Sequence, residues 1–305
     1  METEAPLQEF ESCPLPVEGL SEPTSMAIAQ QLQRVSLLTP LHPNPIATTF
    51  IRQGQGSVPV LLLHGFDSSV FEFRRLIPQL AAQHTTWAVD LLGFGFTERK
   101  SDVPITPEAI NQHLYAFWKT LIAQPAVLVG ASMGGAAAIA FALNHPEAVS
   151  KLVLLDSAGY TVGPALGQFL MPPLGNWATA FLRSPKVRQD IAVKAYHDPV
   201  WASEDAARCA ALHLSAPGWQ QALISFTRSG GYRSYRTRLA ELKQPTLILW
   251  GRSDRILGIR DAEKFAGAIA HSRLVWVDAS GHVPHLEQPH FTANQIHQFI
   301  TARSD

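Results

Sequence analysis

Short apolar or β-branched runs alternate along most of this chain with longer amphipathic segments. The short runs predict strands at Thr49–Arg52, Val58–Leu63, Thr86–Asp90, Ala126–Val129, Leu152–Asp156, Thr246–Trp250 and Leu274–Val277. The longer segments predict helices at Val70–Gln83, Pro107–Ala123, Met133–Asn144, Asp261–Ala270 and Pro289–Thr301. Apolar strands separated by helices are typical of a parallel sheet covered on both faces, so the pattern predicts an α/β fold.

Two parts of the chain do not follow this alternation. Residues 1–43 are predicted to form an N-terminal extension that packs loosely or covers a sheet edge, with a short helix over Met26–Leu38. Residues 157–235 contain helical segments and prolines but no clear strand, which predicts a helical cap inserted into the core. The core would then comprise residues 44–156 and 236–305.

The first part of the predicted cap is strongly apolar, because no charged residue occurs from Ser157 to Leu182. Its prolines and glycines argue against a continuous membrane-spanning helix. The stretch either packs against the core or stays partly exposed as a lipid-facing entrance, with Arg183, Lys186 and Arg188 at its rim. Both alternatives favour a hydrophobic substrate. Four bulky residues are the predicted substrate contacts: Phe169, Trp177, Trp201 and Trp219.

Composition narrows the functional class. The chain has 305 residues, enough for one core with an insert, and a formal net charge of -1, which gives no reason to expect nucleic-acid binding. Cys13 and Cys209 stand alone, without metal-ligand spacing, and fit a reducing compartment. The first 33 residues lack Lys and Arg, so we expect no targeting signal and a cytoplasmic protein, with peripheral contact to a thylakoid membrane as a further option.

The chemistry centres on the sequence Gly130-Ala131-Ser132-Met133-Gly134-Gly135. It directly follows a predicted strand and opens a predicted helix, the context that makes a G-x-S-x-G sequence a nucleophile elbow. The tight turn strains the serine backbone, and small neighbours avoid collisions with the adjacent strand and helix. The sequence therefore predicts Ser132 as a nucleophile.

A serine nucleophile needs a base and an orienting acid, and both follow later in the chain. Asp254 comes after the strand Thr246–Trp250, and His282 comes after Leu274–Val277, which makes them the predicted acid and general base. His285 is the competing base. Asp156, at the end of another strand, is the more serious competing acid; Asp278 also follows a strand, and Asp254 could instead pair with Arg252 or Arg255.

Two backbone N–H groups are the predicted oxyanion hole. One belongs to Met133, directly after the nucleophile, and the other to Phe66, in the loop that follows the strand Val58–Leu63. Gly65 would let the backbone approach a substrate closely. The next residues, Asp67 and Ser68, could instead cap the helix that follows.

These motifs, in the chain order Ser, Asp, His, resemble the α/β-hydrolase superfamily from about Thr49 to Ile300. Further resembling segments are Asp90-Leu91-Leu92-Gly93-Phe94-Gly95, Asn144-His145-Pro146-Glu147 and Gly281-His282-Val283-Pro284-His285-Leu286-Glu287. Dehalogenases and epoxide hydrolases of similar shape carry aspartate where this chain has Ser132, which argues against both activities.

Three segments are similar to a narrower branch of plant and cyanobacterial hydrolases that includes chlorophyll dephytylases. They are His64-Gly65-Phe66-Asp67-Ser68-Ser69, Phe117-Trp118-Lys119 and Ser225-Phe226-Thr227-Arg228-Ser229-Gly230-Gly231-Tyr232. The resemblance implies a hydrophobic ester substrate. The best candidate is the phytyl ester of chlorophyll, which would be cleaved to chlorophyllide and phytol.

We therefore expect a serine ester hydrolase that needs no metal and no organic cofactor. The alternatives are a general carboxylesterase or lipase, a perhydrolase, a carbon–carbon bond hydrolase of ring-cleavage products and, from another class, a non-enzymatic pigment or lipid carrier. The charge-free start of the predicted cap weighs against a carbon–carbon hydrolase, which would need a polar pocket for a carboxylate. An intact triad weighs against a carrier, which has no physical need for one.

Overall fold

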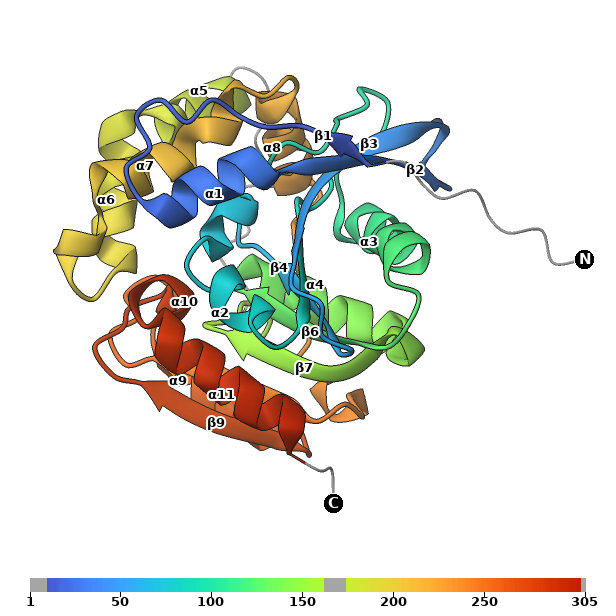
Figure 1. The fold of residues 1–305 in the computed structure, drawn as a ribbon, viewed down its shortest axis with the longest axis vertical. Helices are drawn as coiled ribbons and strands as arrows, with labels where there is room; N and C mark the ends of the chain where they lie inside the picture. The colour runs from blue at the N-terminus through green and yellow to red at the C-terminus, as the bar shows by residue number, and fades with distance from the viewer. Residues whose placement is uncertain (1–9, 162–173, 303–305) are drawn as a thin grey trace, which may run out of the picture.

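The computed structural model describes residues 10–161 and 174–302 of the chain. In that part, the strands form a single sheet in the order β1-β2-β3-β5-β4-β6-β7-β8-β9 (Figure 1). The strands are β1 (Glu11–Ser12), β2 (Gln33–Thr39), β3 (His42–Gln53), β4 (Pro59–Leu63), β5 (Thr85–Val89), β6 (Ala126–Ala131), β7 (Val149–Leu155), β8 (Thr246–Gly251) and β9 (Ser272–Val277). From β5 to β9 all neighbours are parallel, whereas β1, β2 and β3 join antiparallel. The predicted α/β fold is confirmed.

Helices cover both faces of this sheet. One apolar cluster holds Leu61 and Leu63 of β4, and the other holds Val60 and Leu62, so alternate residues of one strand enter opposite cores. The first face is covered by α3 (Pro107–Leu121), α4 (Met133–Asn144) and α9 (Arg260–Ala268). The second is covered by α1 (Pro23–Gln31), α2 (Ile77–Ala81) and α11 (Pro289–Thr301). A central strand buried on both faces must be apolar throughout, as the sequence pattern predicted.

The sheet begins earlier in the chain than expected. Residues 33–39 form β2, so the helix predicted over Met26–Leu38 is wrong for its second half, and the boundary at residue 43 falls inside the β2–β3 hairpin. Val35 and Leu37 are buried while Ser36 and Leu38 are exposed, the alternation of a strand with one covered face.

The helix predicted over Val70–Gln83 is also interrupted. A 3-10 turn, η1 (Val70–Phe73), precedes α2, which starts at Ile77. Pro78 explains the break, because proline has no N–H to donate to the preceding turn and its ring collides with the carbonyl four residues earlier. It sits instead in the first turn of α2, where that donor is not needed.

Between β7 and β8, the described residues form helices and turns only. We call residues 174–235 the helical insertion. It contains α5 (Leu174–Arg183), α6 (Pro185–Ala195), η4 (Pro199–Trp201), α7 (Glu204–Ala211), η5 (Leu212–Ser215) and α8 (Trp219–Arg228). These helices gather at one end of the molecule, beside α1 (Figure 1). The remaining short elements are η2 (Pro146–Ala148), η6 (Leu239–Glu241) and α10 (Pro284–Glu287).

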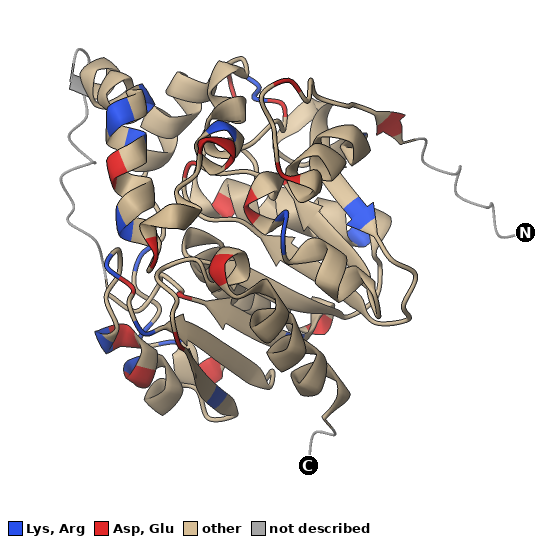
Figure 2. Ribbon diagram, turned by 60° about the vertical axis from the view of Figure 1, so that its left-hand side comes forward, with Lys and Arg blue, Asp and Glu red and all other residues tan. Residues whose placement is uncertain are grey.

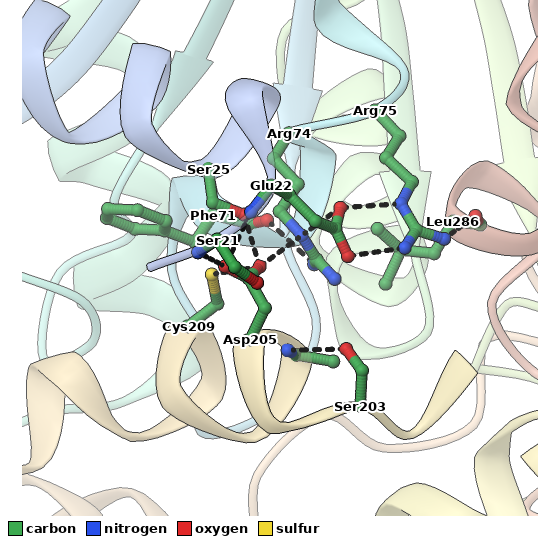
Figure 3. Close-up of polar contacts among 11 residues, drawn as sticks. Ser21, Glu22, Ser25, Phe71, Arg74, Arg75, Ser203, Asp205, Cys209 and Leu286 are labelled. Carbon is green, nitrogen blue, oxygen red and sulfur yellow. Dashed lines mark hydrogen bonds and ion pairs between the residues drawn. The ribbon is translucent and has the colours of Figure 1, made fainter. Parts of the chain in front are cut away.

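The N-terminal segment ties the insertion to the core (Figure 3). Asp205 of α7 accepts hydrogen bonds from the backbone of Ser21 (2.5 Å) and Glu22 (3.0 Å) and from the Ser25 hydroxyl (2.6 Å). Glu22 in turn binds Arg75, which follows η1, at 2.9 and 2.5 Å. The start of the chain therefore bridges the insertion and the core.

Charged residues lie mainly outside the strands of the sheet (Figure 2). Both signs occur close together on α6, which carries Lys186, Arg188, Asp190 and Lys194. None of the helices in the described ranges combines the length and apolar character needed to cross a membrane.

Candidate active site

Ser132 occupies the turn between β6 and α4, and its backbone is strained as the elbow interpretation requires. Its φ is 52° and its ψ is -118°, a region that residues with side chains rarely adopt. Two glycines make the turn possible. A Cβ on Gly130 would lie 2.2 Å from the Gly134 carbonyl oxygen, and one on Gly134 would lie 2.0 Å from the Leu63 carbonyl oxygen. Both positions therefore exclude any side chain.

The predicted base and acid contact each other. His282 Nδ1 lies 3.0 Å from Asp254 Oδ2, and both side chains are buried. The other oxygen of Asp254 accepts the N–H groups of Ile256 (2.7 Å) and Leu257 (3.1 Å). Burial alone would raise the pKa of Asp254, but its bonds to His282 and to these N–H groups lower it. The ionised carboxylate can thus fix the tautomer of His282 and stabilise an imidazolium.

Ser132, Asp254 and His282 follow β6, β8 and β9, which are parallel strands of one sheet with only β7 inserted between the first two. The carboxyl ends of parallel strands share one edge of the sheet, so the three residues rise from the same edge. The competing partners of the acid are engaged elsewhere: Arg252 binds Asp278 at 2.6 Å, and Arg255 binds the backbone of Tyr196.

Asp156, the competing acid, directly follows β7, the strand between those that lead to Ser132 and Asp254. Its side chain is fully buried, and its Oδ1 accepts the Gly251 N–H at 2.9 Å. Carboxylate oxygens of Asp156 and Asp254 and a ring nitrogen of His282 lie within 4.8 Å of one another. Burial and the negative charge of Asp254 raise the pKa of Asp156 well above its usual value. A protonated Asp156 is poorly suited to the role of the acid, and the direct contact of His282 is with Asp254.

His285, the competing base, is removed from this role by its surroundings. Its ring is fully buried, lies 5.4 Å from the Phe73 ring centroid, and approaches Glu72 with a 3.4 Å distance from Nε2 to Oε1. Burial alone would raise the pKa of Glu72, but the contact with His285 brings it down to about 2. Glu72 Oε2 accepts the Gly65 N–H at 2.8 Å. This second acid–histidine pair therefore anchors the loop after β4.

The same loop carries Phe66, one predicted oxyanion donor, and His64 controls its orientation. The Leu91 N–H donates to His64 Nε2 (3.1 Å), so the neutral ring carries its proton on Nδ1 and donates to the Gly65 carbonyl (2.8 Å). Burial lowers the pKa of His64 to about 4, which keeps the ring neutral. Because the Gly65 carbonyl and the Phe66 N–H belong to one planar peptide, holding the carbonyl aims the N–H in the opposite direction. This role of His64 was not predicted.

The second predicted donor, the N–H of Met133, lies at the first residue of α4, where no intrahelical acceptor exists for it. The elbow and the Phe66 loop are close neighbours, since a Cβ on Gly65 would lie 3.4 Å from the Ser132 Cβ. The loop that carries Phe66 thus lies next to the predicted nucleophile, and Met133 follows that nucleophile directly in the chain.

Asp67 does not cap η1, which was the simpler interpretation of its sequence position. Its carboxylate instead accepts three hydrogen bonds from the helical insertion, donated by Arg188, His213 and Trp219. The sequence showed Asp67 only as a polar residue beside Phe66, in the loop after β4. The role of Asp67 could not be predicted, because its partners lie more than 120 residues away in the chain.

The aromatic residues predicted to bind substrate lie in different surroundings. Trp219 is buried and its ring N–H is bonded to Asp67, while Trp201 stacks on the guanidinium of Arg75 at 4.3 Å. Trp177 is 69% exposed on α5. Phe169 lies outside the described residues. The three described aromatic residues thus differ in exposure and in partners, and their contact with substrate stays a prediction.

An open depression of about 580 Å³ lies beside the acid. Its lining includes Asp254 together with His197, Arg255, Leu257 and Ile259, but not Ser132 or Phe66. It borders the outer side of the acid loop and is not the place where the predicted nucleophile would meet an ester.

Comparison with known proteins agrees with this geometry. The fold and the elbow define a hydrolase of the α/β type. The chain belongs to the α/β hydrolase fold family, which it matches over residues 58–289. It is 31% identical over 299 residues to the alpha/beta hydrolase domain-containing protein VTE7 of Arabidopsis thaliana, with 95% of this chain and 90% of that protein covered.

Two further relatives are named for different activities. The chain is 28% identical over 271 residues to the 2-hydroxy-6-oxo-6-(2'-aminophenyl)hexa-2,4-dienoic acid hydrolase of Metapseudomonas resinovorans, covering 85% of this chain and 89% of that enzyme. It superposes with a TM-score of 0.73 and 26% identity on a thermophilic esterase of Thermogutta terrifontis, covering 88% and 98% of the two chains. The superfamily resemblance is confirmed, and the protein is an enzyme of the α/β-hydrolase type.

Proposed function

We propose that the protein is a serine hydrolase that cleaves a hydrophobic carboxylic ester, with the phytyl ester of chlorophyll as the best candidate substrate. The observation that carries the proposal is the buried contact between His282 and Asp254 at the sheet edge that also presents the strained Ser132. The segments shared with plant and cyanobacterial hydrolases and the 31% identity to a plant relative support the chlorophyll branch.

The mechanism follows from these side chains. His282 takes the proton of Ser132 as the hydroxyl oxygen attacks the ester carbonyl, and the N–H groups of Phe66 and Met133 stabilise the oxyanion. Protonated His282 then gives the proton to the leaving alcohol, which leaves an acyl-enzyme. A water molecule, deprotonated by His282, attacks this ester, and release of the acid returns the proton to Ser132.

The surface of the insertion supports a hydrophobic substrate. Trp177 and Phe181, one helical turn apart on α5, are 69% and 63% exposed. The exposed cations Arg183 and Lys186 follow directly along the chain. We propose that the insertion acts as the cap and that this face contacts a membrane surface, such as the thylakoid, where apolar esters dissolve.

A carbon–carbon bond hydrolase is the second candidate, because one relative is named for hydrolysis of a 2-hydroxy-6-oxo-dienoic acid. That chemistry uses the same three residue types but needs a group that recognises the substrate carboxylate. The two candidates are therefore separated by substrate and not by the triad.

The test measures phytol and chlorophyllide released from chlorophyll a in detergent by the native protein, by Ser132→Ala and by the control Ser101→Ala at an exposed site. We expect turnover that only Ser132→Ala abolishes, together with fluorophosphonate labelling that the same variant loses. Cleavage of p-nitrophenyl esters without chlorophyll turnover would refute the substrate but keep the serine esterase. Cleavage of a 2-hydroxy-6-oxo-hexa-2,4-dienoic acid alone would favour the second candidate, and an unlabelled serine would refute both.

A further inference from the structure

The carboxylate of Asp67 is a meeting point between the oxyanion loop and the helical insertion. Trp219 Nε1 donates to Oδ1 at 2.7 Å, His213 Nε2 donates to Oδ1 at 3.1 Å, and Arg188 Nη1 donates to Oδ2 at 2.8 Å. The donors come from three separate elements of the insertion, α8, η5 and α6. Asp67 directly follows Phe66, the proposed oxyanion donor.

The hydrogen bonds between Asp67 and the insertion are expected to be strong, because they are largely shielded from solvent and involve a charged group. His213 and Trp219 are buried, and the side chains of Asp67 and Arg188 are largely covered, at 9% and 17% exposed. Burial alone would raise the pKa of Asp67, but the bonds from His213 and Arg188 lower it, so the carboxylate is ionised. Charge-assisted bonds of this kind are about twice as strong as neutral ones. Arg188 also donates to the Ala210 carbonyl of α7 at 2.5 Å, which brings a fourth element of the insertion to the same point.

The backbone at Asp67 needs this support. Its φ is 49°, in the left-handed region that a residue with a Cβ enters only at a cost. The side chain of Phe66 meets the insertion as well, with its ring centroid 6.0 Å from that of Phe226 on α8. On the other side, the Gly65 N–H and carbonyl are held by the core, through Glu72 and His64.

The peptide N–H of Phe66 thus lies between one anchor in the core and one in the insertion. We propose that Asp67 is a positioning residue, through which the seated insertion holds the Phe66 N–H at the oxyanion. This inference rests on the proposed function. According to this inference, the insertion contributes to catalysis in addition to covering the substrate site. If its three donors moved away from Asp67, the loop that carries the Phe66 N–H would no longer be held in place.

The decisive variant is Trp219→Phe, which removes one donor to Asp67 and keeps an aromatic ring in place. Trp118→Phe is its matched control: Trp118 is also buried and its ring N–H also donates to an oxygen, the Gln124 carbonyl at 2.9 Å, but it belongs to α3 in the core. Asp67→Asn is the second variant, because it keeps the shape of the side chain and removes its charge.

The readout is the rate ratio between an oxyester and the matching thionoester. The sulfur of a thionoester is a poor hydrogen-bond acceptor, so an intact oxyanion hole favours the oxyester. We expect kcat for the oxyester to fall about 10-fold to 100-fold in Asp67→Asn and about 3-fold to 10-fold in Trp219→Phe, since complete loss of one donor costs about 10²-fold to 10³-fold. The thionoester rate and the oxyester KM should change little, so the ratio should fall with kcat.

An unchanged ratio in Trp219→Phe, with native stability by thermal unfolding, would overturn the inference. So would an equal fall in Trp118→Phe, which would indicate a general effect of lost stability. If Asp67→Asn does not fold, Trp219→Phe and Arg188→Lys decide the question. Failure of the proposed function has a different signature, because the native protein would then cleave neither the oxyester nor the thionoester.

Discussion

The paired carboxyl groups of Asp156 and Asp254 lead to a prediction about stability. Asp156→Asn replaces a buried acid by a neutral group of the same shape, which can still accept the Gly251 N–H now bound at 2.9 Å. Burial and the charge of Asp254 raise the pKa of Asp156 in the folded protein, whereas in the unfolded chain an aspartate has a pKa of about 3.9. The folded protein therefore retains a proton that the unfolded chain releases.

The sign of the effect follows from this difference in bound protons. The stability that Asp156 contributes is fully present below about pH 3.9 and is lost as the pH rises towards the raised folded pKa, with a slope of about 1.4 kcal/mol per pH unit. Asn does not titrate, so the variant does not lose this stability as the pH rises. The free energy of unfolding of the variant minus that of the native protein should therefore increase by up to about 1.4 kcal/mol per pH unit. The advantage of Asp156→Asn should therefore grow with pH.

Urea unfolding at pH 4.5, 5.5 and 6.5 measures the difference, with the exposed Asp190→Asn as a control for the loss of one carboxyl group. A difference between native protein and Asp156→Asn that stays constant over these pH values would refute the reasoning, because it would mean that Asp156 is ionised in the fold. Turnover gives an independent check. Asp156→Asn should remain active, since His282 contacts Asp254; loss of activity would make Asp156 the acid of the triad.

Three further outcomes are expected. Asp254→Asn should lower kcat about 10⁴-fold while the protein stays folded, because an amide no longer fixes the histidine tautomer; steady-state kinetics with circular dichroism would check this. Gly134→Ala should lower the melting temperature sharply, because its Cβ would fall 2.0 Å from a backbone oxygen of β4, whereas Gly267→Ala, with nothing within 4 Å, should be neutral or stabilising. Asp205→Ala should cost about 1–3 kcal/mol in urea unfolding, because it leaves the buried Ser25 hydroxyl and the Ser21 N–H without their acceptor; an unchanged midpoint would count against the bridge.

The central strands and the contact between Asp254 and His282 were predictable because their signals are local. A strand buried on both faces must be apolar along its whole length, and the elbow needs small residues at fixed spacing around Ser132. The order of acid and base then followed from the strands that precede them. These features depend on a few neighbouring residues and not on distant contacts.

The first half of β3 was missed because its proline residues argue against a strand, and β2 was missed because its residues were assigned to the helix over Met26–Leu38. Pro43 and Pro45 lie in β3, but β5 pairs with β3 only from Phe50 onward, so these prolines face a sheet edge where no donor is needed. The roles of Asp67 and His64 were missed for another reason. Their partners lie in distant segments, and sequence spacing carries no information on which side chains meet across the fold.

The bridge between Asp205 and the N-terminal segment has a consequence for how the chain folds. Ser25 and Asp205 are 180 residues apart, so the segment around Ser25, which is synthesised well before α7, must wait for that helix before its polar groups find their acceptor. Contacts of such long sequence separation form slowly, because a large loop must be closed before they stabilise anything. We expect the parallel sheet to assemble first and the insertion to dock late. This docking step would bring α7 into contact with the N-terminal segment around Ser25.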